Sequence, residues 1–267
     1  MDHYLAVARE MLFSRDVTLA VVGAMASTFI IYICTVVLHF RLPNLANLLF
    51  WKQFAEGLVI AVSEVKVSIE PQMRAGDEAD TRLYFPSEVV ATNKLLDFLR
   101  GGCRQEPQIT SSSADFDTMR DRNILIVGGS RYNEVARRFM QEIKGELFYV
   151  PRRLLGNAAK LAEHELRFFI GRDASYPDFT YSFQEEAQPA TVILRKDLYA
   201  EGQTVLLVAG ISQESTLAGV TWVLSRPACF WMRVRRYRKG FQAIIRCRVI
   251  SQYKVSNIRE IFYQELS

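Results

Sequence analysis

The chain has 267 residues, of which 49% are hydrophobic and 23% charged, and its formal net charge is +4. This length leaves room for one membrane segment and one domain of ordinary size, with a small module between them. A charge of +4 is too small by itself to indicate nucleic-acid binding, and four scattered cysteines without a CxxC pair argue against a disulfide framework, a zinc site or another metal site.

Residues 17–40, VTLAVVGAMASTFIIYICTVVLHF, contain no charged side chain. At 1.5 Å per residue a helix of this length crosses a hydrocarbon core of about 30 Å. We therefore predict a transmembrane helix within an N-terminal segment, 1–44; a buried core helix is the alternative. The large, cysteine-containing remainder is expected in the cytoplasm, which predicts a single-pass protein of the cell inner membrane.

One face of this helix carries polar side chains. The expected pore-lining residues, which share that face at 100° per residue, are Ala24, Thr28, Tyr32, Thr35 and His39. Because a single span cannot enclose a pore, this interpretation predicts a homo-oligomer in the lipid bilayer. The alternative is a monomeric anchor whose threonine hydroxyls bond to carbonyls of their own helix.

The next stretch, 45–118, is expected to be a helical connector and linker. Apolar residues recur at helical spacing over 45–66, which predicts an amphipathic helix, and whether it enters the membrane is left open. A second helix is expected over 87–100. The polar, serine-rich stretch 105–117 then predicts a linker.

From residue 119 to 267 the pattern is that of an α/β domain with a Rossmann-like parallel sheet. The first βαβ unit is expected from a strand in NILIVGGS, a helix over 133–144 and a strand over 146–150. Further strands are expected at 190–194 and, more weakly, at 179–183. TVLLVAG, 204–210, predicts a strand followed by a helix from about Leu217, with Ser215 or Thr216 as its cap.

The C-terminal part begins with a basic stretch, FWMRVRRYRKG, which predicts a short helix ending before Gly240. Its arginines are expected to contact nucleic acid or lipid headgroups, or simply to face solvent. A strand is predicted over 241–251. Residues 257–266 fit a strand or a helix equally well.

Two strand-to-helix turns, GGSRYN and GISQEST, are expected at the carboxyl edge of the sheet, where open α/β sheets bind ligands. Glycines permit a close approach of the backbone, free N–H groups favour anions, and arginines bind phosphates. The expected ligand-binding residues are Gly128, Gly129, Ser130, Arg131, Asn133, Arg152, Arg153, Gly210, Ser212, Ser215 and Thr216. Neither turn matches GxGxxG or GxxxxGK[ST], and a tight turn without a ligand is the alternative.

Catalytic signals are weak. His164 is the one histidine of the C-terminal part, and the sequence has no GxSxG elbow. We therefore expect no catalytic residues, no cofactor and no enzymatic activity.

The span at 17–40, together with ILIVGGSRYNE and VLLVAGISQEST, resembles the plan of membrane effectors in bacterial antiphage signalling. These include CRISPR-associated Rossmann sensors fused to a span and the membrane partners of nucleotidyltransferases in CBASS, Pycsar and Hailong systems. The resemblance implies an ion channel or pore controlled by a nucleotide or oligonucleotide ligand made by a partner nucleotidyltransferase. The ligand's identity, the direction of gating and the subunit number are left open.

Overall fold

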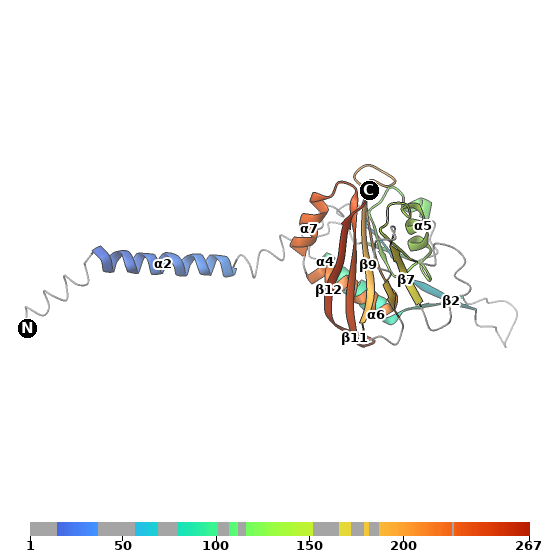
Figure 1. Ribbon diagram of the computed structural model, residues 1–267, viewed down its shortest axis with the longest axis horizontal. Coiled ribbons are helices and arrows are strands. Elements are labelled where there is room, and N and C mark those ends of the chain that lie inside the picture. The colour runs from blue at the N-terminus through green and yellow to red at the C-terminus, as the bar shows by residue number, and fades with distance from the viewer. Residues whose placement is uncertain are drawn as a thin grey trace, which may run out of the picture. The chain divides into compact units, whose positions relative to one another are not determined.

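The computed structural model describes residues 15–36, 57–68, 80–100, 107–111, 116–151, 166–171, 179–181, 187–225 and 227–267. The chain divides into two compact units, Met1–Ala46 and Asn47–Ser267 (Figure 1). In the first unit, helix α2 (Arg15–Val36) covers most of the expected span, and residues 37–40 lie outside the described residues. Among the helices described, none meets both the length and the apolarity required to cross a membrane. The transmembrane helix therefore stays a prediction.

The second unit is built on one seven-stranded sheet. Its strands, in spatial order, are β12 (Lys254–Glu265), β11 (Gly240–Ser251), β9 (Ala187–Lys196), β10 (Thr204–Gly210), β5 (Ile124–Val127), β1 (Val59–Val62) and β4 (Gln108–Ser111). The four strands β10, β5, β1 and β4 run parallel, and β9, β11 and β12 are added through antiparallel pairings. The mixed α/β class is thus confirmed.

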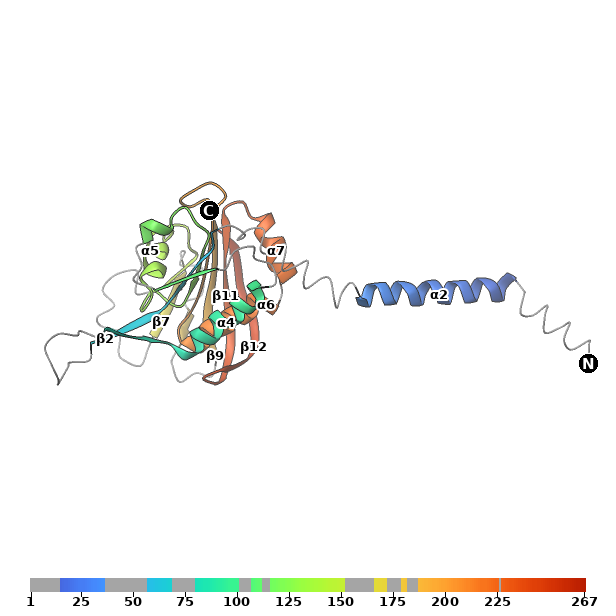
Figure 2. The ribbon, with the colours of Figure 1, turned by 180° about the vertical axis from the view of Figure 1, so that it is seen from behind.

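Helices cover both faces of this sheet (Figures 1 and 2). One face packs against α4 (Pro86–Arg100), α6 (Gln213–Ser225) and α7 (Pro227–Arg236). The other face packs against α5 (Glu134–Glu142) and the short 3₁₀ helix η2 (Phe116–Met119). Strands β1, β5 and β10 contribute to both cores and are buried along their length, which is why they consist of continuous apolar runs.

Two small antiparallel sheets complete the unit. They comprise β2 (Glu64–Ser68) with β3 (Asp80–Tyr84), and β6 (Tyr149–Pro151) with β7 (Leu166–Gly171) and β8 (Phe179–Tyr181). The buried Gln242 of β11 joins β6 to the main sheet. Its Oε1 accepts from the Phe148 and Tyr149 N–H groups, at 3.0 Å each, and its Nε2 donates to the Tyr149 carbonyl at 2.8 Å.

Many expected elements are confirmed. These are the helices near 87–100, 133–144, 217 and 231–239, and the strands near 123–127, 179–183, 190–194, 204–210 and 241–251. The C-terminal stretch left open between strand and helix is strand β12, which pairs with β11.

The helix expected over 45–66 is wrong for residues 59–62, which form the buried strand β1 between β5 and β4, and for residues 64–66, which belong to β2. Leu58, Val59, Val62 and Val65 fit a helical spacing, but Val59–Val62 is also a continuous apolar run of the kind that a fully buried strand requires, and Val65 lies in β2. Because β1 and β4 pair in the main sheet, a boundary between 45–118 and 119–267 would cut through that sheet. Residues 45–56 lie outside the described residues.

The expected βαβ unit is also wrong in one strand. The stretch 146–150 leads into β6, which pairs with β7 in a separate sheet, and β5 instead lies between β1 and β10. In the same way, β9 is antiparallel to β10, so the main sheet is not purely parallel.

Candidate functional site

The two glycine turns meet at one edge of the sheet, as predicted. Val62, Val127 and Val208 are aligned in register at the carboxyl ends of β1, β5 and β10. The Gly128 N–H donates to the Val208 carbonyl at 2.9 Å, and a Cβ on Gly129 would lie 3.4 Å from the Gly210 carbonyl oxygen. The two turns are therefore in contact.

The edge between β1 and β5 is a topological switch point. After β1 the chain continues through α4 on one face of the sheet to β4, whereas after β5 it continues through α5 on the opposite face. Figures 1 and 2 show α4 and α5 on opposite sides of the sheet. Ligands of open α/β sheets bind where successive connections diverge in this way.

A buried carboxyl group lies at this switch point. Glu88, in the first turn of α4, is 5% exposed, and Ser63, directly after β1, is fully buried. A Cβ placed on Gly128 would come within 2.7 Å of Glu88 Oε2 and would also clash with Ser63 Oγ. Among the described residues, neither Glu88 Oε2 nor Ser63 Oγ makes a hydrogen bond of good geometry. The glycine thus leaves room for the buried Glu88 carboxyl group and the buried Ser63 hydroxyl, which lie close enough for the hydroxyl to stabilise the carboxylate.

Burial raises the pKa of Glu88 from its ordinary 4.5 to about 7, and the neighbouring Ser63 hydroxyl offsets part of this rise. The folded chain consequently binds this proton more tightly than the unfolded chain. As far as Glu88 is concerned, stability is greatest below pH 4.5 and falls as the pH rises through about 7. A carboxyl group of this kind donates or accepts a hydrogen bond near neutral pH.

The Asn133 side chain is engaged in hydrogen bonds within the fold. It is fully buried and caps α5, since its Oδ1 accepts from the Ala136 N–H at 3.1 Å. Its Nδ2 donates to the carbonyls of Ala61 and Val127, at 3.3 Å each, and so joins β1 to β5. Asn133 therefore holds the switch point together, and the ligand contact expected of it stays a prediction.

The second turn is similarly held by its own side chains. The α6 cap is Ser212, whose Oγ accepts from the Ser215 N–H at 3.2 Å, and not Ser215 or Thr216 as expected. Ser215 Oγ accepts from the Ser212 N–H, and Thr216 Oγ1 accepts from the Gly210 N–H at 2.9 Å. Both hydroxyl groups are buried and also donate to the Ser212 carbonyl. Ser215 and Thr216 shape the turn, and Ser212 is its more exposed hydroxyl.

Arg131 and Tyr132 form the exposed side of the first turn. The Arg131 guanidinium lies 4.8 Å from the centre of the Tyr132 ring, which in turn packs on Phe85 at 4.9 Å. Ser130 lies beside them, and its carbonyl accepts from Arg137 Nε at 3.2 Å. These groups offer a cation and an aromatic ring next to the buried carboxyl group.

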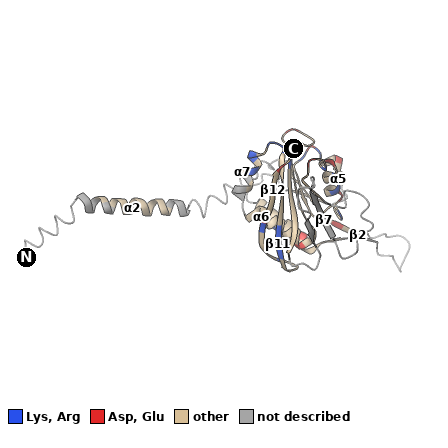
Figure 3. Ribbon diagram, in the orientation of Figure 1, with Lys and Arg blue, Asp and Glu red and all other residues tan. Residues whose placement is uncertain are grey.

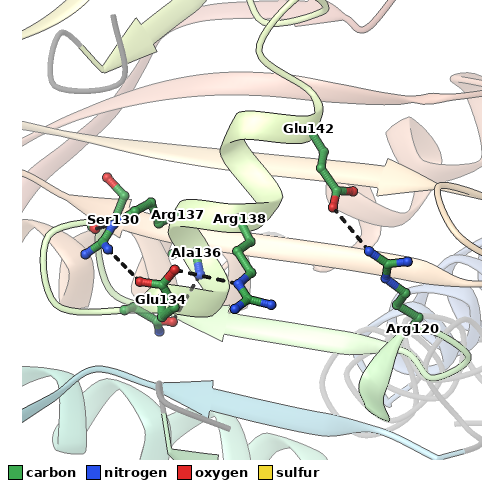
Figure 4. A network of polar contacts seen from close by, with 8 residues as sticks. Arg120, Ser130, Glu134, Ala136, Arg137, Arg138 and Glu142 are labelled. Atoms are coloured by element: carbon green, nitrogen blue, oxygen red, sulfur yellow. Dashed lines mark hydrogen bonds and ion pairs between the residues drawn. The ribbon is translucent and has the colours of Figure 1, made fainter. Parts of the chain in front are cut away.

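The start of α5 carries its own negative charge. Figure 4 shows Glu134 between Arg137 and Arg138, with N–O distances of 2.6 and 3.6 Å, and Arg120 near Glu142 at 3.9 Å. The Glu134 carboxylate already lies at the amino end of α5, where the helix dipole is positive. The free N–H groups alone therefore do not make an anion site there.

Arg152 and Arg153 lie outside the described residues, as does His39; of the Thr35 side chain nothing is described. Ala24, Thr28 and Tyr32 are exposed on α2. The Thr28 hydroxyl donates to the Ala24 carbonyl at 2.8 Å, as in the anchor alternative.

Ser63 and Glu88 were not expected from the sequence. Glu88 falls within the helix predicted over 87–100, and Ser63 falls within the helix predicted over 45–66. A strand predicted there instead would have indicated a polar group at its carboxyl end. Within the described part of the chain, no three His, Cys, Asp or Glu side chains gather as a metal site requires. The sequence matches no protein-family model and no curated protein.

Proposed function

We propose that this chain is a ligand-gated, oligomeric membrane effector, an ion channel or pore, that acts in antiphage defence. Its α2 segment is the transmembrane helix, and its C-terminal Rossmann-like domain senses a nucleotide-type second messenger in the cytoplasm. The observation that supports the proposed sensing role is the buried carboxyl group of Glu88, which lies beside Ser63 and Gly128 at the switch point.

The chemistry of this edge suits the nucleoside part of a ligand. Unsatisfied buried oxygens cost free energy, and ribose hydroxyl or base amino groups would satisfy them. A carboxylate that accepts from a ribose hydroxyl is a recurrent arrangement at the edges of such sheets. Arg131 is the described cation of the turn, and Arg152 and Arg153 are proposed to bind phosphate groups.

Gating requires that the ligand bind one state of the assembly more tightly than the other. The switch-point edge contains the start of α4 and the turn before α6, and these two helices pack together on one face of the sheet. A ligand between Glu88 and Ser212 would therefore act on the α4–α6 pair.

The main alternative is a membrane-anchored, ligand-binding scaffold without a pore. The hydrogen bond from Thr28 to the Ala24 carbonyl favours this alternative, because it satisfies the hydroxyl donor inside a single helix. A less favoured alternative is a membrane-tethered α/β enzyme that processes nucleotides, and turnover of a nucleotide would distinguish it.

The test is ion flux from liposomes that contain the full chain, with nucleotide extracts of its host applied outside. Glu88→Ala is expected to abolish the response to the extract, because it removes the buried acceptor. Replacing residues 17–40 by an unrelated leucine-rich helix is the second arm. A pore predicts that this replacement abolishes flux while ligand binding persists; flux that is absent under every condition would refute the channel and leave the scaffold.

A further inference from the structure

A basic cluster, defined here as Arg235, Arg236, Arg238 and Lys239, lies at the end of α7 and directly before β11. All four side chains are exposed, and Met232, one turn earlier, is 56% exposed. Figure 3 shows Lys and Arg gathered at this end of α7. The cluster belongs to neither the switch-point edge nor its two turns.

The fold does not need these charges to terminate α7. Lys196 Nζ already donates to the Val234 and Tyr237 carbonyls at the helix end. The preceding Arg233 anchors the helix, since it pairs with Glu260 and lies 3.9 Å from the centre of the Tyr263 ring. The basic cluster is therefore exposed positive charge beyond these anchoring contacts, and its Arg236 guanidinium lies 5.7 Å from the centre of the Tyr237 ring.

The register of the sheet places the cluster at the edge where the chain enters the unit. One line of paired residues runs across five strands, from Gly240 through Arg195, Val205 and Ile124 to Val59. Lys239 and Leu58 thus lie at the same edge. Ser63, Gly128 and Gly210 end their strands at the opposite edge, where the candidate ligand site lies.

The connection to α2 is short. Residues 37–56 separate α2 from the described start of the unit, and twenty residues reach at most about 70 Å when fully extended. If α2 anchors the chain, as in the proposed function on which this inference rests, the described start of the unit stays within that distance of the bilayer surface. Anionic headgroups attract clustered Lys and Arg side chains close to such an anchor.

We propose that the basic cluster of α7 docks on anionic lipid headgroups. The amino edge of the sheet then faces the bilayer, and the switch-point edge faces the cytoplasm, where a soluble ligand reaches it. Each cation contributes roughly a fivefold preference for an anionic surface at low ionic strength.

The test is hydrogen exchange of the full chain in nanodiscs of phosphatidylcholine, with or without phosphatidylserine. The matched variants are Arg235→Glu/Arg236→Glu and, as a control with the same change of charge, Arg246→Glu/Arg259→Glu. Arg246 and Arg259 are exposed partners on β11 and β12, toward the opposite end of β11. We expect slower exchange over 232–239 when phosphatidylserine is present, with the slowing lost at high salt and in the α7 variant but kept in the control.

Three results would overturn the docking. These are slower exchange over 232–239 that does not depend on lipid charge, slower exchange that is still seen in the α7 variant, and slower exchange over the β11–β12 hairpin instead of over 232–239. Slowing that follows protein concentration would assign the cluster to a second copy of the chain, and slowing by an added RNA oligonucleotide without lipid would assign it to nucleic acid. Vesicle flotation at high salt distinguishes a failure of the membrane anchor from a failure of the docking alone. A chain that does not float contradicts the membrane anchor itself, whereas a chain that floats without protection over 232–239 contradicts only the docking.

Discussion

Replacement of Gly128 by alanine tests the geometry of the switch point most directly. Gly128 has φ 109°, a conformation that side chains rarely adopt, and its added Cβ would clash with Ser63 Oγ and approach Glu88 Oε2 to 2.7 Å and Oε1 to 2.9 Å. The positive φ costs about 1–2 kcal/mol. Crowding in a buried site adds about 1–3 kcal/mol. We therefore expect a loss of about 2–5 kcal/mol in the free energy of unfolding.

Gly202 provides the matched control. Its φ is also positive, at 80°, but a Cβ there would meet nothing within 4 Å. Gly202→Ala should consequently cost only the conformational part, about 1–2 kcal/mol. The difference between the two variants isolates the crowding around Gly128, to which both Ser63 Oγ and the Glu88 carboxyl group contribute.

The measurement is urea unfolding of the full chain in detergent micelles, followed by tryptophan fluorescence. A Glu88→Ala background should reduce the cost of Gly128→Ala, because it removes the carboxyl group that the new methyl group meets; such a coupling is the signature of direct contact. Equal costs for Gly128→Ala and Gly202→Ala would refute the crowding around Gly128. Full additivity with Glu88→Ala would assign that crowding to Ser63 Oγ and refute the close approach of Gly128 to Glu88.

Other variants test the remaining parts of the site and the span. Glu88→Gln should remove a decline in stability of about 3 kcal/mol between pH 4.5 and pH 8, which follows from the raised pKa, and unfolding curves across that range measure it. Asn133→Ala should cost about 2–4 kcal/mol through the lost cap and two unsatisfied carbonyls. Asn133→Asp keeps the cap but sets a buried carboxylate oxygen against those two carbonyls, so it should cost at least as much in the same assay. Thr28→Val should lower ion conductance in a pore and leave ligand affinity intact; unchanged currents would favour an anchor. Arg152→Ala should weaken binding of a phosphate-bearing ligand and reduce its salt dependence in titration calorimetry, with little effect on folding.

The parts of the fold that could be predicted are those with an unambiguous local pattern. Ile124–Val127 and Thr204–Gly210 are apolar runs that end in glycine, and in each case a helix with a polar cap follows. These features indicated both turns and their shared edge. The contact between the turns followed because carboxyl ends of parallel strands lie at one edge of a sheet.

The remaining features of the fold and of the candidate site depended on contacts between residues far apart in the sequence. Val59–Val62 fits both a helix and a strand locally, and its identity is decided by burial between β4 and β5. The direction of β9 likewise depends on its antiparallel partners β10 and β11. Glu88 became a candidate site residue only once α4 was placed beside Gly128, because a glutamate in a first helical turn is ordinarily a surface residue favoured by the helix dipole.

The side chain of Gln242 has a consequence for how the unit opens. Its amide takes the place of a neighbouring backbone for Phe148 and Tyr149, and the Tyr149 ring packs on Phe262 at 4.5 Å. The Gln242 hydrogen bonds and this packing together hold β6 to the main sheet. Local opening free energies follow such contacts. Exchange of the Phe148 and Tyr149 amides should therefore report a partial opening distinct from that of β9 and β11. Gln242→Leu would make the three-stranded sheet exchange as an independent unit, while the seven-stranded sheet keeps its own protection.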